Sequence, residues 1–154
     1  MLDVRLPDFN FTLPITVFFR DLDAMAHVNN ATYFSYFEEA RSRYWLSLFE
    51  HAMDFKKLGF IVVHAECDYV SGAAYGEALL VGCKVTGIGR SSFAIDYRIV
   101  SGEATTDAQA RIVATGKTVQ ALFDWTTQKT VPFTEDLRRR LEAREGPIKA
   151  LGSH

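Results

Sequence analysis

The sequence is short of cysteine. It contains only two cysteines, Cys67 and Cys83, and neither has a CxxC or CxxxH neighbour. This spacing argues against a disulfide framework and against a structural zinc site. We therefore expect no metal in the functional site, and we expect the reducing cytoplasm as the compartment.

The sequence also lacks a charge excess and a long apolar run. Its 17 basic and 19 acidic residues give a formal net charge of −2, far from the concentrated positive field that sequence-independent nucleic-acid binding needs. No window approaches the roughly 18 to 20 apolar residues of a membrane span. Asp3, Arg5 and Asp8 stand where a signal peptide would be apolar. We expect a soluble, unexported protein, with neither nucleic acid nor a membrane span involved.

Several common functional motifs are missing as well. The sequence has no GxxxxGK[ST], GxGxxG, GxSxG or HExxH pattern, so phosphate loops, dinucleotide folds, serine-hydrolase elbows and zincin helices are unsupported. What the chain has in number is aromatic residues, 2 Trp, 6 Tyr and 12 Phe, enough to line a groove as well as a core. Its length predicts a single domain over residues 1–154, with a core at about 11–125.

Two hydrophobic periodicities predict an α+β fold. Alternation over about residues 11–20 predicts a strand, and apolar spacings of three and four from Ala31 predict a helix of about 20 residues. The apolar stripe of this helix is wide, which favours a curved sheet wrapped around it. Alternation then predicts four more strands, at residues 63–69, 81–85, 93–99 and about 108–123. Short turns between them imply an antiparallel sheet. Thr134 is the expected N-cap of a short helix over 134–145.

Polar side chains gather between the first strand and the helix, at Asp21, Asp23, His27, Asn29 and Asn30. Unpaired N–H groups at a helix start can polarise a carbonyl or hold an oxyanion without a metal. A nearby carboxylate can attack that carbonyl or activate a water molecule. The same residue types are also common caps and turn formers. The residues alone leave both interpretations open.

These residues carry a resemblance to a known family. The signature consists of Asp21-Leu22-Asp23, His27-Val28-Asn29-Asn30, Ala31-Thr32-Tyr33-Phe34 and Glu38-Glu39-Ala40-Arg41. It resembles the N-terminal signature of hot-dog-fold acyl-CoA thioesterases of the 4-hydroxybenzoyl-CoA thioesterase family, and also the version in plant acyl-ACP thioesterases. The similarity continues through residues 64–69, Gly76-Glu77 and residues 87–93, so it covers about 15–123.

The resemblance implies a hot-dog fold, in which an antiparallel sheet of about five strands wraps around a long central helix. It implies that the sheets of two subunits join edge to edge and bind acyl thioesters at their interface, as a homodimer or a homotetramer. The substrate would be an acyl-CoA. No cofactor is expected, since CoA is part of the substrate.

The resemblance also implies roles for individual residues. Asp23 would be the nucleophile or general base, and the backbone N–H of Asn30 would polarise the thioester carbonyl. His27 would orient Asp23, donate to the substrate, or serve a structural hydrogen bond. Arg90 and Ser92 occupy positions where relatives hold the phosphates of the coenzyme. The chain has Met25 where the plant motif has asparagine, and Arg90 is a lone basic residue in its segment.

Three further residues are candidates for substrate binding: Asn29, Tyr33 and Glu66. Each has a structural alternative. Asn29 can cap the helix, Tyr33 can be a core residue, and Glu66 shares a strand face with His64 and Asp68, which is typical of a solvated face.

The predicted function is hydrolysis of an acyl-CoA thioester to a carboxylic acid and CoA. Three alternatives stay open. They are an acyl-ACP thioesterase, a hot-dog hydratase or dehydratase, and an acyl-thioester-binding protein without turnover. The sequence does not select a chain length, nor aryl against alkyl substrates.

Overall fold

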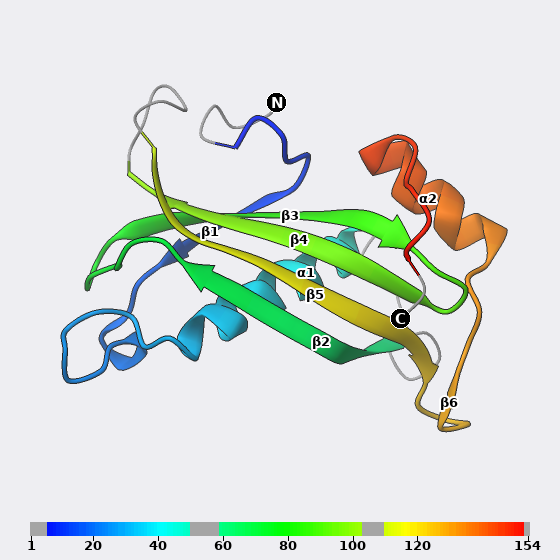
Figure 1. Ribbon diagram of the computed structural model, residues 1–154, viewed down its shortest axis with the longest axis horizontal. Helices are drawn as coiled ribbons and strands as arrows, with labels where there is room; N and C mark the ends of the chain where they lie inside the picture. The colour runs from blue at the N-terminus through cyan, green and yellow to red at the C-terminus, as the bar shows by residue number, and fades with distance from the viewer. Residues whose placement is uncertain (1–5, 50–58, 103–109, 153–154) are drawn as a thin grey trace.

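The computed structural model describes residues 6–49, 59–102 and 110–152, which form a sheet, a long helix and a shorter helix (Figure 1). In chain order the elements are β1 (Thr12–Thr16), the 3-10 helix η1 (Phe19–Asp21), α1 (Thr32–Ser47), β2 (Gly59–Tyr69), β3 (Ala78–Ile88), β4 (Ser92–Ser101), β5 (Arg111–Asp124), β6 (Lys129–Thr130) and α2 (Glu135–Glu145). The strand order is β1-β3-β4-β5-β2, and β6 pairs with β5. Each of these strand pairings is antiparallel. The predicted α+β class is confirmed.

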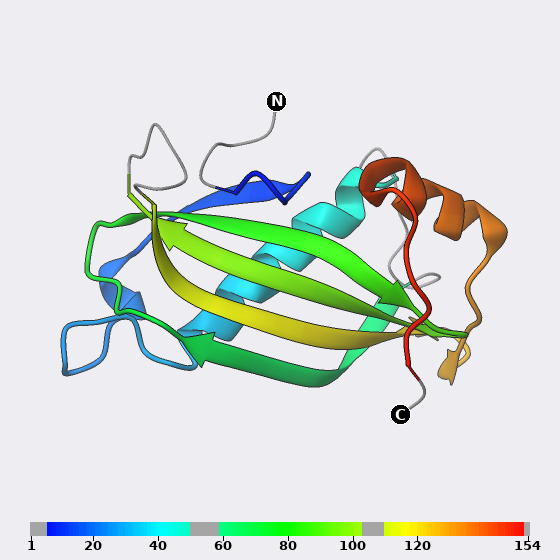
Figure 2. The same ribbon diagram turned by 45° about the horizontal axis from the view of Figure 1, so that its top comes forward.

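Helix α1 lies across one face of the curved sheet (Figure 2). The absence of a side chain at Gly116 lets the ring of Phe37 lie directly on β5, and a Cβ there would be 2.4 Å from Phe37 Cε2. Phe37 stacks on Tyr97 of β4, and the ring centroids are 4.4 Å apart. Trp45 stacks on Phe93 in the same way, at 5.2 Å. Many of the aromatic residues therefore fill the core between α1 and the sheet.

The opposite face of the sheet carries a smaller apolar cluster. Leu6 and Phe9, from the segment before β1, pack there on Leu80 and Val100. The side chains of Lys84 and Arg98 lie over the ring of Phe9. This face is thus only partly covered, and it carries more charge than the face that holds α1.

Two elements are shorter than the sequence pattern predicts. Strand β1 ends at Thr16 rather than near residue 20, because the chain turns into η1, where the Asp21 carboxylate accepts the N–H of Phe18 at 2.9 Å. The predicted helix of about 20 residues has 16, and its final carbonyls accept the N–H of Leu48. Both elements end because of local hydrogen bonds, which the hydrophobic periodicity of the sequence does not reveal.

Strands β2, β3 and β4 extend further than predicted, and β5 begins later, at Arg111. Strand β2 begins at Gly59, four residues earlier than the alternation suggested. Residues 108–109 of the last predicted strand lie outside the described residues, and β5 is described from Arg111. The short strand β6 was not predicted. The C-terminal helix is confirmed, and Thr134 Oγ1 accepts the N–H of Leu137 at 3.1 Å.

The arrangement puts the polar segment 21–31 at one end of the sheet, beside the C-terminal end of β2 (Figure 1). The turn between β3 and β4 lies at the opposite end. No described helix combines the length and the apolar character needed to cross a bilayer. Cys67 and Cys83 are both free thiols, and burial raises the pKa of Cys83.

Candidate active site

A tight turn after η1 presents the carboxylate of Asp23. The Asp23 N–H donates to the carbonyl of His27 at 3.1 Å, and the Asp23 carbonyl accepts from Ala26 at 3.0 Å. Ala26 has a φ of +61°, which allows the chain to reverse. Asp23 Oδ1 accepts the N–H of Met25 at 2.9 Å. Its other oxygen, Oδ2, has no hydrogen-bond partner among the described residues and is available to a ligand.

The His27 ring is fixed by its neighbours. Its Nδ1 lies 2.9 Å from the carbonyl oxygen of Met25. Because a carbonyl only accepts, the hydrogen bond requires a proton on Nδ1, so the neutral ring keeps its lone pair on Nε2. Gly72 lies against the ring, and a Cβ at Gly72 would be 2.7 Å from His27 Cδ2. The glycine is therefore needed for this ring position.

The start of α1 presents an unpaired backbone donor, the N–H of Asn30. Asn29 stabilises the turn that leads into α1. Its Oδ1 accepts the N–H of Ala31 and its carbonyl accepts the N–H of Thr32, both at 2.9 Å. The carbonyl of Asn30 accepts the Tyr69 hydroxyl at 2.8 Å. Within the described part of the chain, the Asn30 N–H has no partner. An N–H in this position, at the positive end of the helix dipole, is suited to a carbonyl oxygen or an oxyanion.

Asp23, His27, Asn30 and Tyr33 line one pocket of about 410 Å³. Its remaining walls come from Met25, Val28, Tyr69, Val70, Ser71 and Gly72. Tyr33 is 3% exposed and contributes to the core as well as to the pocket wall, and burial raises the pKa of its phenol. The structure thus brings together residues that supply a carboxylate, an imidazole and a backbone donor at one pocket.

The other predicted site residues lie elsewhere in the chain. Asn29 shapes the helix entry but does not line this pocket. Gly116 faces Phe37 of α1, so the next residue, Lys117, and its register partner Glu66 face away from the helix. The Glu66 carboxylate lies 3.1 Å from His64 Nε2.

Arg90 and Ser92 lie in and after the turn between β3 and β4. Ser92 pairs with Ala121, which in turn pairs with Ile61 of β2. The Asp23 pocket contains Tyr69, eight residues further along the same strand, roughly 26 Å away at about 3.3 Å per residue. A single chain therefore does not bring Arg90 or Ser92 to Asp23.

Sequence reasoning missed three residues that shape the site: Tyr69, Gly72 and Ala73. Tyr69 was only the end of an alternating run, although its hydroxyl supports Asn30. Ala73 is completely buried, and its carbonyl accepts the N–H of Val28 at 2.9 Å. Among the described residues, no group of three His, Cys, Asp or Glu side chains is arranged to hold a metal ion.

A helix wrapped by an antiparallel sheet, with a carboxylate and an unpaired N–H at the helix start, defines the hot-dog thioesterase class. The sequence matches the Thioesterase-like superfamily over residues 17–141, and the chain belongs to this family. The predicted resemblance, the hot-dog fold and the assignment to the thioester hydrolases are thereby confirmed.

Curated relatives and solved structures agree with the family. Long-chain acyl-CoA thioesterase FadM of Escherichia coli is 29% identical over 126 residues, which are 79% of this chain and 89% of FadM. Acyl-CoA thioesterase YbgC of Haemophilus influenzae is 27% identical over 60% of this chain and 71% of YbgC. A thioesterase of Thermus thermophilus, solved with coenzyme A and Zn, is 30% identical with a TM-score of 0.74, and the match covers 91% of this chain and 97% of that one.

Proposed function

We propose that the protein hydrolyses an acyl-CoA thioester to a carboxylic acid and CoA, with Asp23 as the reacting carboxylate. The observation that carries this proposal is that Asp23, which has an unengaged carboxylate oxygen, and Asn30, which has an unpaired N–H, line the same pocket. FadM and YbgC are both named as acyl-CoA thioesterases, and the Thermus thermophilus thioesterase was solved with coenzyme A. These relatives support the coenzyme as part of the substrate.

In this reaction the Asn30 N–H donates to the thioester carbonyl oxygen and stabilises the negative charge that develops there. As a nucleophile, Asp23 attacks the carbonyl carbon, the C–S bond breaks, and water hydrolyses the resulting anhydride. As a general base, Asp23 instead removes a proton from the attacking water, and the tetrahedral intermediate then expels the thiolate. Both routes release the same acid and thiol. His27 lines the same pocket and supplies a second proton acceptor at Nε2.

The complete site requires a second copy of the chain. Strand β2 is an edge of the sheet and exposes Val62 and Val63, which are 43% and 59% exposed. An apolar sheet edge favours pairing with another strand. Two β2 strands paired antiparallel about a twofold axis near Ala65 bring the far end of one sheet to the Asp23 end of the other. Arg90 of the partner subunit then reaches the phosphates of the coenzyme.

Each remaining predicted residue has a role in this arrangement. Ser92 of the partner subunit assists at the phosphates, Tyr33 contacts the substrate from the pocket wall, and Asn29 maintains the helix entry. Glu66 lies near the middle of β2 and borders the junction between the subunits. The assembly is a homodimer, or a homotetramer built from such dimers. The single domain and the cytoplasmic location stay predictions from the sequence.

The test measures thiol release from a panel of acyl-CoA esters that includes straight-chain and aryl acyl groups. Each thioester is offered both on CoA and on acyl carrier protein. The proposal predicts thiol release with the CoA esters at a rate proportional to enzyme concentration. Release only from the carrier protein would favour the acyl-ACP alternative. A change in enoyl absorbance without thiol would indicate a hydratase, and tight binding without turnover would indicate a binding protein.

A further inference from the structure

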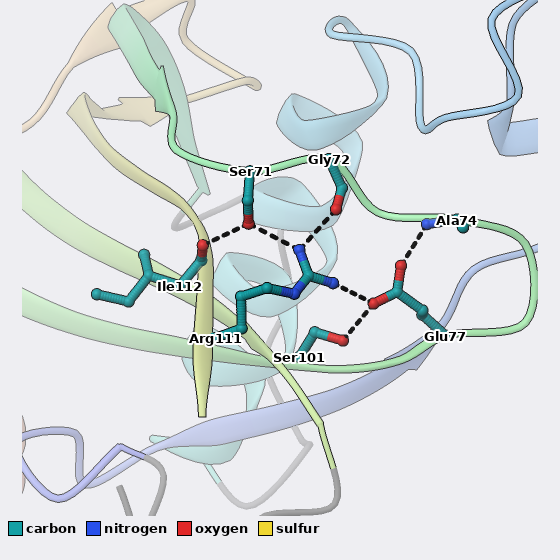
Figure 3. Close-up of polar contacts among 7 residues, drawn as sticks. All are labelled: Ser71, Gly72, Ala74, Glu77, Ser101, Arg111 and Ile112. Atoms are coloured by element: carbon teal, nitrogen blue, oxygen red, sulfur yellow. Dashed lines mark hydrogen bonds and ion pairs between the residues drawn. The ribbon is translucent and has the colours of Figure 1, made fainter. Parts of the chain in front are cut away.

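One Arg–Glu pair anchors the segment between β2 and β3 (Figure 3). Arg111, the first residue of β5, donates from Nη1 to Ser71 Oγ and to the carbonyl of Gly72, each at 2.7 Å. Its Nη2 pairs with Glu77 Oε1. The guanidinium thus binds both ends of the segment at once, because Ser71 and Gly72 begin it and Glu77 ends it.

Glu77 extends the anchor to two further groups. Its Oε1 also accepts the hydroxyl of Ser101, the last residue of β4, at 2.6 Å, and its Oε2 accepts the backbone N–H of Ala74. Ser71 Oγ in turn donates to the carbonyl of Ile112 at 2.6 Å. Figure 3 shows these groups converging from β4, β5 and the loop on the two charged side chains.

The same segment contacts the polar segment 21–31 on its other side. Gly72 lies against the imidazole of His27, and the carbonyl of Ala73 accepts the N–H of Val28 at 2.9 Å. Val28 also forms an isolated antiparallel bridge with Leu22, the residue before Asp23. Residues 72–73 therefore stand between the Arg–Glu anchor and the residues that flank Asp23.

We propose that Arg111 and Glu77 are positioning residues for the Asp23 site: they hold Gly72 and Ala73 where these fix His27 and Val28. This inference rests on the proposed function. The Arg111 side chain is 44% exposed and that of Glu77 26% exposed, so water screens the attraction between the two charges, and the hydrogen bonds of Glu77 contribute most of what the pair adds to stability. Its value lies in geometry, since a displacement of about 1 Å at a reacting group can cost about a hundredfold in rate.

The central variants are Arg111→Lys, which keeps the charge but loses the guanidinium fork, and Glu77→Gln. We expect kcat to fall about tenfold or more, with KM within about threefold of the wild type. The matched control is Arg43→Lys. Arg43 pairs with Glu39 at 2.9 Å on α1 and is 61% exposed, and this variant should keep wild-type kcat and KM.

A direct contact between Arg111 and the coenzyme phosphates is the competing explanation. It is separated by repeating the measurements with an acyl-pantetheine thioester, which carries no phosphate. Positioning predicts the same fold loss of kcat with both substrates. Phosphate binding instead predicts a raised KM with acyl-CoA and no defect with acyl-pantetheine, and that result would overturn the proposal.

A double-mutant cycle with His27→Ala tests the route of the effect. Arg111 acts in part through Gly72 and His27. Arg111→Lys should therefore lower kcat by a smaller factor in the His27→Ala background than in the wild type. Fully additive losses would contradict this route. If Arg111→Lys does not fold, Ser101→Ala removes only one hydroxyl from Glu77 and should lower kcat about threefold.

Two failures are distinguishable. A wild type that releases no thiol refutes the proposed function. A wild type that hydrolyses acyl-CoA, together with anchor variants that keep its kcat, refutes the positioning role alone.

Discussion

The Glu77 carboxylate is held in its charged form by its neighbours. Burial alone would raise its pKa, but hydrogen bonds from Ser101 and the Ala74 N–H, together with the Arg111 charge, outweigh burial and lower the pKa below its ordinary value of 4.5. The titratable groups that interact with the Glu77 carboxylate are Arg111 from β5 and Tyr33 from α1. A lowered pKa means that the folded state favours the carboxylate over the acid.

Because the pKa of Glu77 is lower in the folded state, the free energy of unfolding depends on pH. The contribution of Glu77 is fully present above its ordinary pKa of 4.5, and it is lost as the pH falls through the lower pKa of the folded state. We therefore expect Glu77→Gln to cost about 1 kcal/mol at pH 7, or roughly 3 °C in Tm, and this difference to narrow as the pH falls below 4.5. Thermal unfolding of both proteins between pH 7 and pH 3 measures this gap. A gap that stays constant, or one that Glu39→Gln reproduces, would contradict the assignment.

At the scale of elements, the contact between α1 and β5 depends on one glycine. A Cβ at Gly116 would lie 2.4 Å from Phe37 Cε2 and 3.0 Å from the carbonyl oxygen of Glu66. Phe37 is completely buried and cannot move without disturbing the core. Helix and strand therefore approach this closely only because the side chain is missing.

Gly116→Ala should accordingly destabilise the fold by about 1 to 3 kcal/mol, the usual cost of overpacking a core. The control is Gly152→Ala, because a Cβ at Gly152 meets nothing within 4 Å. Chemical denaturation of the two variants and the wild type gives the comparison. Equal midpoints for Gly116→Ala and the wild type would show that the helix adjusts without cost.

Much of this element structure could be predicted from the sequence, because alternation and helical spacing record which face is buried. The long strands β3, β4 and β5 were found for that reason, whereas the Thr134 cap was found from the residue preference at helix starts. The early end of β1 was not found, since it depends on the bond between the Asp21 carboxylate and the Phe18 N–H. A hydrogen bond of this kind cannot be predicted from a hydrophobic pattern.

The site was predictable only where its residues are near each other in sequence. Asp23, His27 and Asn30 lie in one short segment and line one pocket. The support from Gly72 and from Arg111 comes from distant parts of the chain and requires the strand order. Arg90 could be named from the resemblance, but its distance from Asp23 within one chain could not.

At the scale of the whole molecule, that distance is the basis for the proposed site between two copies of the chain. Arg90 lies at the opposite end of the sheet from Asp23, and β2 between them is an edge strand with exposed apolar side chains. In the proposed dimer, antiparallel pairing of two such edges accounts for both facts. Two copies would then form two equivalent sites, each drawing Asp23 from one chain and Arg90 from the other.

Mixing subunits tests this arrangement. Asp23→Asn dimers should be inactive, and Arg90→Ala dimers should have a KM for acyl-CoA raised about tenfold by the loss of a charged hydrogen bond. A mixed dimer contains one site with both residues intact, so co-refolding the two variants should restore activity at low substrate concentration. Activity equal to the sum of the separate variants would place Arg90 outside the partner's site.

The central claim is that the Asp23 carboxylate drives thioester hydrolysis, and the kcat of Asp23→Asn tests it most directly. Asparagine keeps an oxygen that can accept the Met25 N–H, now held by Asp23 Oδ1 at 2.9 Å, so the turn is preserved while the charge is lost. Asp124→Asn is the matched control, because Asp124 Oδ1 accepts the N–H two residues on at 2.8 Å at the other end of the sheet. We predict that Asp23→Asn lowers kcat for thiol release by about a hundredfold or more, with an unchanged Tm, while the control keeps wild-type kcat. Wild-type thiol release by folded Asp23→Asn would contradict the account.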